Sequence, residues 1–313
     1  MGKCDRCSKE GKIFLVYGPH YFCHSHFLEF FEKRVRKTIN KFRLVKPGEK
    51  IAIGVSGGKD SITVLHLLRE IFPKGTELRP VCIDEGIPGY RDKALRIAKK
   101  HFQELGLDCT IISMKKELGF SMLEIAKKLG KEKEKQETQG ACSYCGVFRR
   151  KLLNDFAVSE RCNKLATGHN LDDEAQTILM NQFRRNISAS ARLGPITGVI
   201  QDERFIRRIK PLYFLTEREI AAFAFLNNLK DEYVECPNAA VSYRCNLRDW
   251  LNEIEAKYPG TKHSIVNSFM EIQPILRKRL DLKKIKTCKI CAEPCSQDIC
   301  QACKLADKLK LLN

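Results

Sequence analysis

The sequence predicts an α/β protein with a Rossmann-like, doubly wound parallel sheet and a small cysteine-rich module at each end. Short apolar runs alternate with helical patterns through the middle of the chain, and cysteine pairs two residues apart lie near both termini. Such alternation is typical of βαβ units around a parallel sheet. A chain of 313 residues is long enough for one core of this kind with small appendages.

The N-terminal module, residues 1–26, is too short for a hydrophobic core of its own and needs another source of stability. It contains Cys4 and Cys7, followed by Cys23, His24 and His26. Two groups of thiol and imidazole ligands at this spacing are typical of tetrahedral zinc. We expect Cys4, Cys7, Cys23 and His26 to bind the metal, with His24 as the alternative to His26.

Residues 27–46 follow this module, with apolar residues near helical spacing and lysines and arginines on the other face. We expect a basic amphipathic helix that connects the module to the main domain, residues 47–235. Within that domain the apolar runs predict strands at residues 50–55, 78–84, 108–113 and 163–168. Helical patterns are expected at residues 62–72, 91–105, 121–129, 140–158, 170–183 and 216–229, and a charged linker at 131–139.

A glycine-rich turn, "GVSGGKDS", joins the first strand to its helix. Backbone N–H groups in such a turn, together with a helix N-terminus, form a binding site for phosphate. The turn is not a Walker A loop, because Lys59 is followed by Asp60 instead of Ser or Thr. The predicted phosphate-binding residues are Ser56, Gly57, Gly58, Lys59, Asp60 and Ser61.

Two further motifs follow strands in the same way. Asp84 lies in "CIDEGIPGYR" after the second strand, and Gly168, His169, Asp172 and Asp173 lie in "ATGHNLDDEAQT" after a later one. Ligands of open parallel sheets bind in the crevice outside the carboxyl ends of the strands, so we expect these residues to border one site. The alternative for Asp173 is a simple interaction with the helix dipole.

The motif "GACSYCGVFRR" contains Cys142 and Cys145 at the predicted start of a helix, with Arg149 after them. A third thiol further along the chain is either Cys236 or Cys245. Three thiolates would suit an iron–sulfur cluster with one open iron, or a persulfide-forming pair, whereas structural zinc would need a fourth ligand.

Helical patterns at residues 248–257 and 261–279 fall in a predicted helical extension, residues 236–284. Residues 285–313 are again cysteine-rich, and their two Cys-x-x-Cys pairs predict a zinc ribbon with one spare thiol, Cys295. The four expected ligands are Cys288, Cys291, Cys300 and Cys303.

The chain carries 56 lysines and arginines against 38 acidic residues, a formal net charge of +18. This charge favours a polyanionic partner, nucleic acid above all, although a lysine-rich surface also serves solubility alone. No apolar run is long enough to cross a bilayer, and the first residues lack the apolar segment of a signal peptide. We therefore expect a soluble, cytoplasmic protein without a membrane partner.

The glycine-rich turn resembles the PP-loop of the ATP pyrophosphatase superfamily. Together with "IDEGIPGYR", "GACSYCGVFRR", "TGHNLDDEAQT", "VECPNA" and the two terminal modules, it resembles the TtcA/TtuA family of tRNA 2-thiouridine synthetases, in the archaeal and eukaryotic-cytosolic branch. This resemblance implies that ATP with magnesium binds at the loop and is cleaved to AMP and pyrophosphate. It also implies a tRNA substrate, a sulfur donor that is either sulfide or a ubiquitin-like thiocarboxylate protein, and a homodimer.

The resemblance further implies roles for individual residues. Cys142, Cys145 and Cys236 would hold a 4Fe-4S cluster, and Cys245 would not. Asp173 and Arg149 would assist proton transfer and charge stabilisation, and Lys59 would neutralise charge on the phosphates. Since an arginine stays protonated, Arg149 is expected to act electrostatically and not as a base.

Three alternatives remain at this level. The cysteines could carry sulfur as a persulfide without a cluster, the protein could be a PP-loop amidoligase, or it could be a zinc-ribbon RNA-binding protein with a degenerate nucleotide fold. The sequence also leaves open which uridine is modified, in the anticodon or in the T-loop.

Overall fold

In the computed structural model the chain is described over residues 2–132, 140–198, 204–229, 231–238, 242–279, 286–295 and 297–311. Most of the predicted linker, residues 131–139, lies outside these ranges. Among the described residues, no helix combines the length and apolar character that crossing a membrane requires.

A six-stranded sheet forms the centre of the molecule, with strand order β5-β4-β3-β6-β8-β7. Five of its strands are parallel, and β7 pairs antiparallel with β8 at one edge. Strand β3, the first strand of this sheet along the chain, lies in its middle. Its residue Ala52 pairs with Arg79 of β4 on one side and with Leu165 of β6 on the other. The predicted Rossmann-like parallel sheet is therefore confirmed. The strands are β3 (Lys50–Gly54), β4 (Glu77–Asp84), β5 (Thr110–Ser113), β6 (Lys164–Thr167), β7 (Ile196–Thr197) and β8 (Arg207–Ile209).

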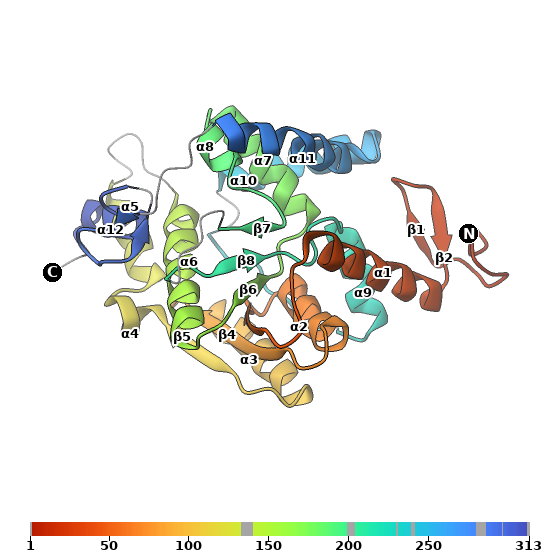
Figure 1. Ribbon diagram of the computed structural model, residues 1–313, viewed down its shortest axis with the longest axis horizontal. Helices are drawn as coiled ribbons and strands as arrows, with labels where there is room; N and C mark the ends of the chain where they lie inside the picture. Colours follow the sequence, from red (N-terminus) through yellow and green to blue (C-terminus); the bar gives the residue numbers. More distant parts are fainter. Residues whose placement is uncertain are drawn as a thin grey trace.

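Helices cover both faces of this sheet (Figure 1). On one face, apolar side chains of the strands pack in a core with α1 (His24–Phe42), α2 (Lys59–Ile71), α3 (Arg91–Glu104) and α9 (Glu217–Leu226). On the other face a second core contains α4 (Met114–Leu118), α5 (Met122–Glu132), α6 (Ala141–Ser159) and α12 (Gln301–Lys308). Burial on both faces explains why β3, β4 and β6 read as nearly continuous apolar runs.

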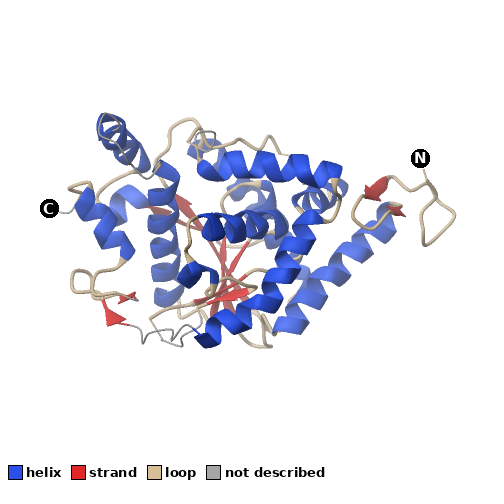
Figure 2. Cartoon of the chain, turned by 90° about the horizontal axis from the view of Figure 1, so that it is seen from above, coloured by secondary structure: helices blue, strands red, loops and turns tan. Residues whose placement is uncertain are grey.

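A third group of helices lies beyond the β7 edge of the sheet (Figure 1), and the view from above shows the strands enclosed by helices (Figure 2). It has a small core of its own, to which Leu171, Tyr213, Leu251 and Phe269 contribute. Its members are α7 (Leu171–Phe183), α8 (Ile187–Ser190), α10 (Tyr243–Lys257) and α11 (Thr261–Arg279). The helix α11 packs along α7, and its Lys262 pairs with Asp172 at the start of α7, beside Asp173.

The two terminal modules lie at opposite ends of the molecule (Figure 1). The N-terminal one contains an antiparallel hairpin of β1 (Ile13–Leu15) and β2 (His20–Phe22), and the C-terminal one pairs β9 (Lys286–Thr287) with β10 (Pro294–Cys295). These strands of two or three residues, like β7 and β8, were not predicted, because they are too short to show a periodicity.

Several helix ends differ from the predicted ones. Helix α1 begins at His24 and not at residue 27, so His26 lies on its first turn. Helix α10 begins at Tyr243, five residues earlier than expected, because the Ser242 hydroxyl accepts a hydrogen bond from the backbone N–H of Cys245. The predicted capping box of Thr216 and Glu219 is present at the start of α9.

Candidate functional site

The loop between β3 and α2 is held in shape by its own serines. The Ser61 hydroxyl donates to the carbonyl of Gly58 at 2.8 Å and accepts from the backbone N–H of Ser56 at 3.1 Å. The backbone N–H of Gly58 in turn donates to the Ser56 hydroxyl at 3.2 Å. These bonds curl the chain immediately before the N-terminus of α2, which is the arrangement expected of a phosphate-binding loop.

Two glycines allow other backbone segments to approach this loop closely. Gly57 has φ of +83°, and a Cβ there would lie 2.1 Å from the carbonyl oxygen of Ala94 on α3. Gly168, which follows β6, would place a Cβ only 3.0 Å from the backbone of Asp60. Both positions require glycine for space, and Gly57 requires it for its backbone conformation as well.

Charged side chains surround the start of α2. Lys59 Nζ lies 2.7 Å from Oδ1 of Asp60 and 3.2 Å from Oε1 of Glu217. Burial raises the pKa of Asp60 to about 6, although Lys59 opposes the shift. Asn170 at the start of α7 donates to the other carboxylate oxygen of Asp60 at 3.0 Å. The loop of β3 and the loop of β6 therefore meet at Asp60, between the two central strands.

The end of β4 joins the same site through a buried ion pair. Glu85 and Arg91 lie 2.9 Å apart, and both side chains are at most 4% exposed. The Arg91 guanidinium also donates to the carbonyl of Ser56 in the loop, while Glu85 lies 3.6 Å from Arg149 on α6. Asp84, the predicted ligand-binding residue, accepts a hydrogen bond from the backbone N–H of Gly86 at 3.0 Å. Arg91 thus connects the phosphate-binding loop to the helix that begins with the cysteines.

The thiols of Cys142 and Cys145 lie in the first turns of α6. Cys142 Sγ donates to the carbonyl of Asn238 at 3.1 Å, which brings the segment 231–238 against the start of this helix. Burial raises the pKa of Cys145 to about 11, although the Arg149 charge opposes the shift, and the charges of Cys236 and Cys142 also act on it. Cys236 and Cys145 pack against the same hydrophobic core. The structure therefore brings Cys142, Cys145 and Cys236 into one neighbourhood.

Cys245 has different surroundings, on α10. Its Sγ accepts from Arg248 at 3.3 Å and lies 3.8 Å from the carboxylate of Asp249. Among the described residues, no hydrogen bond joins Cys245 to the start of α6. Of the two candidates for the third thiol, Cys236 is the one that shares the surroundings of Cys142 and Cys145.

His169 and Asp173 follow the end of β6, on either side of Asn170, which contacts Asp60. The ring Nδ1 of His169 lies 2.9 Å from the hydroxyl of Thr167. Burial lowers the pKa of His169 well below its ordinary value, and the nearby cations of Lys210, Arg208, Arg149 and Arg244 lower it further. The imidazole is therefore uncharged at neutral pH.

Asp173 begins α7 and has two roles in the structure. It completes a capping box with Asn170, a local role at the helix start like the one that the helix-dipole alternative assigned to it. Its Oδ1 also accepts a hydrogen bond from Arg244 at 3.2 Å. Burial raises the pKa of Asp173, although the charge of Arg244 opposes the shift. A carboxylate with a raised pKa is suited to accept a proton.

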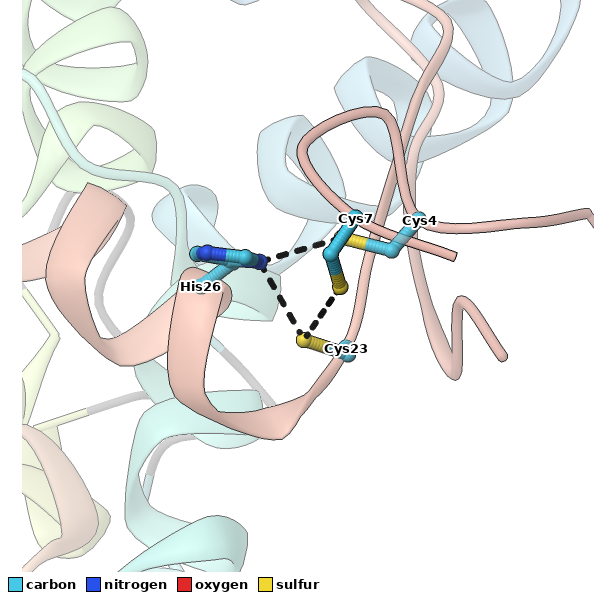
Figure 3. A group of neighbouring side chains, drawn as sticks. All are labelled: Cys4, Cys7, Cys23 and His26. Atoms are coloured by element: carbon cyan, nitrogen blue, oxygen red, sulfur yellow. Dashed lines mark hydrogen bonds between the residues drawn. The ribbon is translucent and has the colours of Figure 1, made fainter. Parts of the chain in front are cut away.

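The N-terminal module gathers four possible metal ligands (Figure 3). His26 Nδ1 lies 3.4 Å from the sulfurs of both Cys4 and Cys23, and the sulfurs of Cys7 and Cys23 are 3.8 Å apart. All four ligand atoms lie within 4.8 Å of one another, and His24 is not in the group. Because zinc binds sulfur at about 2.3 Å and nitrogen at about 2.0 Å, a tetrahedral ion fits this spacing.

The C-terminal module gathers the four predicted thiols in the same way, within 4.8 Å of one another, as Cys288, Cys291, Cys300 and Cys303. Cys295 stays apart from the group, with its thiol donating to the carbonyl of Gln297. Three of the four thiols are buried, and the module packs with α6 in the second core. Metal bound here would therefore also stabilise the helix that carries Cys142 and Cys145.

The sequence missed three residues that the structure places in the site. Arg91 and Asn170 stand inside the motifs "CIDEGIPGYR" and "ATGHNLDDEAQT", but at helix starts, where a charged or capping residue is ordinary and does not stand out. Arg244 contacts Asp173 across 71 residues of chain, and nothing local to Arg244 indicates that contact. Only their tertiary contacts distinguish them.

The fold and the site define an ATP-binding protein of the PP-loop type, and comparison with known proteins agrees. Residues 28–253 match the family model of the PP-loop domain. The chain is 37% identical to the tRNA-5-methyluridine(54) 2-sulfurtransferase of Pyrococcus horikoshii, covering 99% of this chain and 96% of the relative. It is 33% identical to the tRNA 2-thiolation protein NcsA of Haloferax volcanii, covering 98% of this chain and 99% of the relative.

A solved structure is also similar over the whole chain. It is the U34-tRNA thiolase NcsA from Methanococcus maripaludis with its [4Fe-4S] cluster, with a TM-score of 0.84 and 32% identity over 100% of this chain and 98% of that one. The chain belongs to the family of PP-loop tRNA 2-thiolation enzymes.

Proposed function

We propose that this protein replaces the C2 oxygen of a tRNA uridine with sulfur, using ATP to activate the base. The observation that carries the proposal is the connection between the two halves of the site. The phosphate-binding loop contacts Arg91, Arg91 pairs with Glu85, and Glu85 lies beside Arg149 on the helix that begins with Cys142 and Cys145. Relatives named as tRNA sulfurtransferases and thiolases support tRNA as the substrate.

The PP-loop residues Ser56, Gly57, Gly58, Lys59, Asp60 and Ser61 would bind the ATP phosphates. The uridine O2 attacks the α-phosphorus, and the bond to the leaving pyrophosphate breaks. Lys59 would exchange its contact with Glu217 for the phosphates and neutralise their charge, while Asp60 would bind magnesium. Asp84, Gly168 and His169 border the nucleotide in this proposal.

Adenylation turns the carbonyl oxygen into part of a leaving group. The uridine N3–H becomes acidic in this step, and Asp173, whose pKa burial raises, is suited to accept that proton. Sulfide then forms the C2–S bond, and AMP leaves with the original oxygen. Arg149 stays charged and would stabilise negative charge at the reacting atoms.

In the part of the chain that the structure describes, Cys142, Cys145 and Cys236 share a neighbourhood without a fourth metal ligand, and three such thiols fit a 4Fe-4S cluster. They do not come within 4.8 Å of one another as the two terminal groups do, which suits a cluster, since each thiolate binds a different iron. Such a cluster would supply an open iron at which sulfide can bind. The alternative, a persulfide on one of these cysteines, uses the same residues.

The two terminal groups fit one zinc ion each, since both offer four soft ligands at tetrahedral spacing. A closed site of this kind leaves no position for substrate, so we assign them a structural role. We retain the division into modules at residues 1–26 and 285–313 around a domain of residues 47–235, with a connecting helix at 27–46 and a helical extension at 236–284. The protein would form a homodimer. Light scattering would measure the mass of the assembly in solution.

The relatives are named for two different positions, U34 and position 54, so the choice of uridine is part of the test. Some eukaryotic relatives are named cytoplasmic tRNA 2-thiolation proteins, which supports a cytoplasmic location. Sulfide and a ubiquitin-like thiocarboxylate protein remain the two candidate sulfur donors. Comparing them requires adding each in turn to the purified enzyme.

The deciding experiment uses anaerobically purified protein with unmodified tRNA, ATP, magnesium and sulfide. Mass spectrometry of the digested tRNA should detect 2-thiouridine, and AMP and pyrophosphate should form in step with it. Fragment mapping then locates the modified uridine. Release of AMP with an added amine but without sulfur incorporation would instead identify an amidoligase, and tRNA binding without ATP cleavage would identify a degenerate RNA-binding protein.

A further inference from the structure

Two arginines beside the site, Arg150 on α6 and Arg208 on β8, have no carboxylate partner among the residues that the structure describes. Their neighbours Arg149 and Arg244 lie near Glu85 and Asp173, respectively. The carboxylate that acts on Arg208, that of Glu174, is bonded through one oxygen to Lys210 at 2.6 Å. Within the described part of the chain, neither guanidinium therefore forms an ion pair, although the charge of Glu174 acts on Arg208.

These two arginines line one small cavity of about 150 Å³. It lies between the sheet, the side of α6 and the C-terminal module, since its wall also includes Leu165, Phe205 and Pro294. The two other charged groups in the wall, Lys151 and Glu293, are paired with each other. Among the wall residues that the structure describes, the cavity therefore presents two guanidinium groups without an ion pair and no free carboxylate.

The cavity adjoins the predicted cluster site. A Cβ on Gly146 would lie 3.3 Å from a terminal nitrogen of Arg150, so this side chain folds back along α6 toward the turn that carries Cys145. The charge of Cys145 also acts on Arg150. A group bound between Arg150 and Arg208 would thus lie next to the thiols and would extend away from them toward the C-terminal module.

The local electrostatics favour an anion there. Burial, together with the charges of Arg208, Arg149 and Arg244, lowers the pKa of Arg150 to about 10. Burial likewise lowers the pKa of Arg208. Like charges at this density repel one another, and an anion with several acceptor oxygens would relieve that repulsion.

We propose that Arg150 and Arg208 together bind a backbone phosphate of the tRNA next to the uridine that is modified. This inference rests on the proposed function, because it takes tRNA as the substrate. The fork of donors on each guanidinium matches the oxygens of a phosphate diester, and the cavity has room for one such group. The contact would hold the RNA strand while its base turns toward the thiols.

The test is the salt dependence of tRNA binding to the full-length protein, with R208Q, R150Q and, as a control, R69Q. Arg69 is an exposed arginine on α2, on the other face of the sheet. Each lost phosphate contact should reduce the slope of log K against log salt by about 0.7 to 0.9. R208Q and R150Q should each show this reduction, while R69Q keeps the wild-type slope. An unchanged slope in both cavity variants overturns the inference.

Two further measurements separate this role from others. In the absence of RNA, R208Q should melt at a higher temperature than wild type, because it removes an unpaired cation, whereas loss of a purely structural arginine would lower the melting temperature. Affinity for ATP should not change. If the variants weaken ATP binding and leave the tRNA slope intact, the arginines serve the triphosphate and the inference is wrong.

The proposed function can fail separately. If wild-type protein forms no 2-thiouridine with either sulfur donor, yet its tRNA slope still depends on Arg208, the thiolation proposal is wrong and the phosphate contact stands. If thiolation proceeds and neither cavity variant alters tRNA binding, the phosphate contact is wrong and the thiolation proposal stands.

Discussion

His101 Nε2 lies 2.6 Å from Oδ2 of Asp231, and this bond ties α3 to the segment that carries Cys236. Lys100 holds the other carboxylate oxygen at 2.9 Å, and the His101 side chain is only 2% exposed. The segment 231–238 has no helix or strand of its own, so such side-chain bonds fix its position. The bond between His101 and Asp231 thereby helps to fix the position of Cys236, a predicted cluster ligand.

The variant D231A should destabilise the protein by about 1 to 3 kcal/mol, because it leaves the buried His101 without its acceptor. It should also reduce iron content and thiolation by more than the loss of folded protein explains, since Cys236 is only five residues away. Urea unfolding and iron analysis on the same preparation measure the two effects. E104A is the control: Glu104 lies 3.1 Å from the same ring but is 48% exposed, and its loss should have little effect.

The neighbouring His66 makes stability depend on pH. Burial and the charge of His101 lower the pKa of His66 from 6.5 to about 4, although Glu104 and Asp231 oppose the shift. Between these two values the unfolded chain binds a proton that the folded chain does not, so the free energy of unfolding falls as the pH is lowered through this window.

H66Q should remove that contribution. The difference in unfolding free energy between wild type and H66Q should be constant above pH 7 and should move in favour of H66Q between pH 6.5 and 4. Measuring the two proteins side by side cancels the acid sensitivity of the thiolate sites. A difference that stays constant through the window would show that His66 keeps its ordinary pKa.

Gly57 offers a test of the loop that separates space from backbone conformation. G57A adds a methyl group 2.1 Å from a backbone oxygen at φ of +83°, so the loop must move, and ATP cleavage should fall to background. G48A has a similar φ of +77° with nothing within 4 Å. It should cost about 1 to 2 kcal/mol of stability and leave ATP cleavage intact. If both variants lost ATP cleavage equally, the positive φ of the backbone, and not the space beside the Cβ, would explain the loss.

The sheet and the loop could be predicted from the sequence because each produces a pattern in consecutive residues. The strands around Ala52 and Leu165 are buried on both faces, so they appear as apolar runs, and the turn from Ser56 to Ser61 is a continuous motif. The Cys-x-x-Cys pairs were equally visible, since one zinc ion needs ligands at short spacing. These features require no knowledge of how distant segments meet.

The polar contacts around the site could not be predicted from the sequence. Asp60 with Asn170 and Asp173 with Arg244 join segments far apart in the chain, Glu85 pairs with Arg91 across the turn between β4 and α3, and each residue taken alone has an ordinary local reason to be where it is. The unpaired state of Arg208 is even less visible, because it depends on which carboxylates other cations already occupy. Such properties belong to the three-dimensional arrangement.

The choice between His26 and His24 can be settled by metal analysis. We expect one zinc ion for each of the two ligand groups, and H26A should lose the N-terminal ion, because His26 Nδ1 faces two sulfurs at 3.4 Å. H24A is the matched control two residues away on the same helical turn, and it should keep both ions. Loss of zinc from H24A alone would reverse the assignment.

The third cysteine of the cluster site is tested by C236S against C245S. Cys236 shares the neighbourhood of Cys142 and Cys145, so C236S should lose iron, the visible absorbance of the cluster and thiolation together, as C142S and C145S should. Cys245 is bonded to Arg248 on α10, and C245S should keep its iron and stay within about twofold of wild-type activity. AMP formation by C236S need not vanish, because the PP-loop contacts are independent of this thiol. A C236S protein that keeps full thiolation without iron would exclude both the cluster and a persulfide on Cys236, and would leave Cys142 and Cys145 as the remaining sulfur carriers.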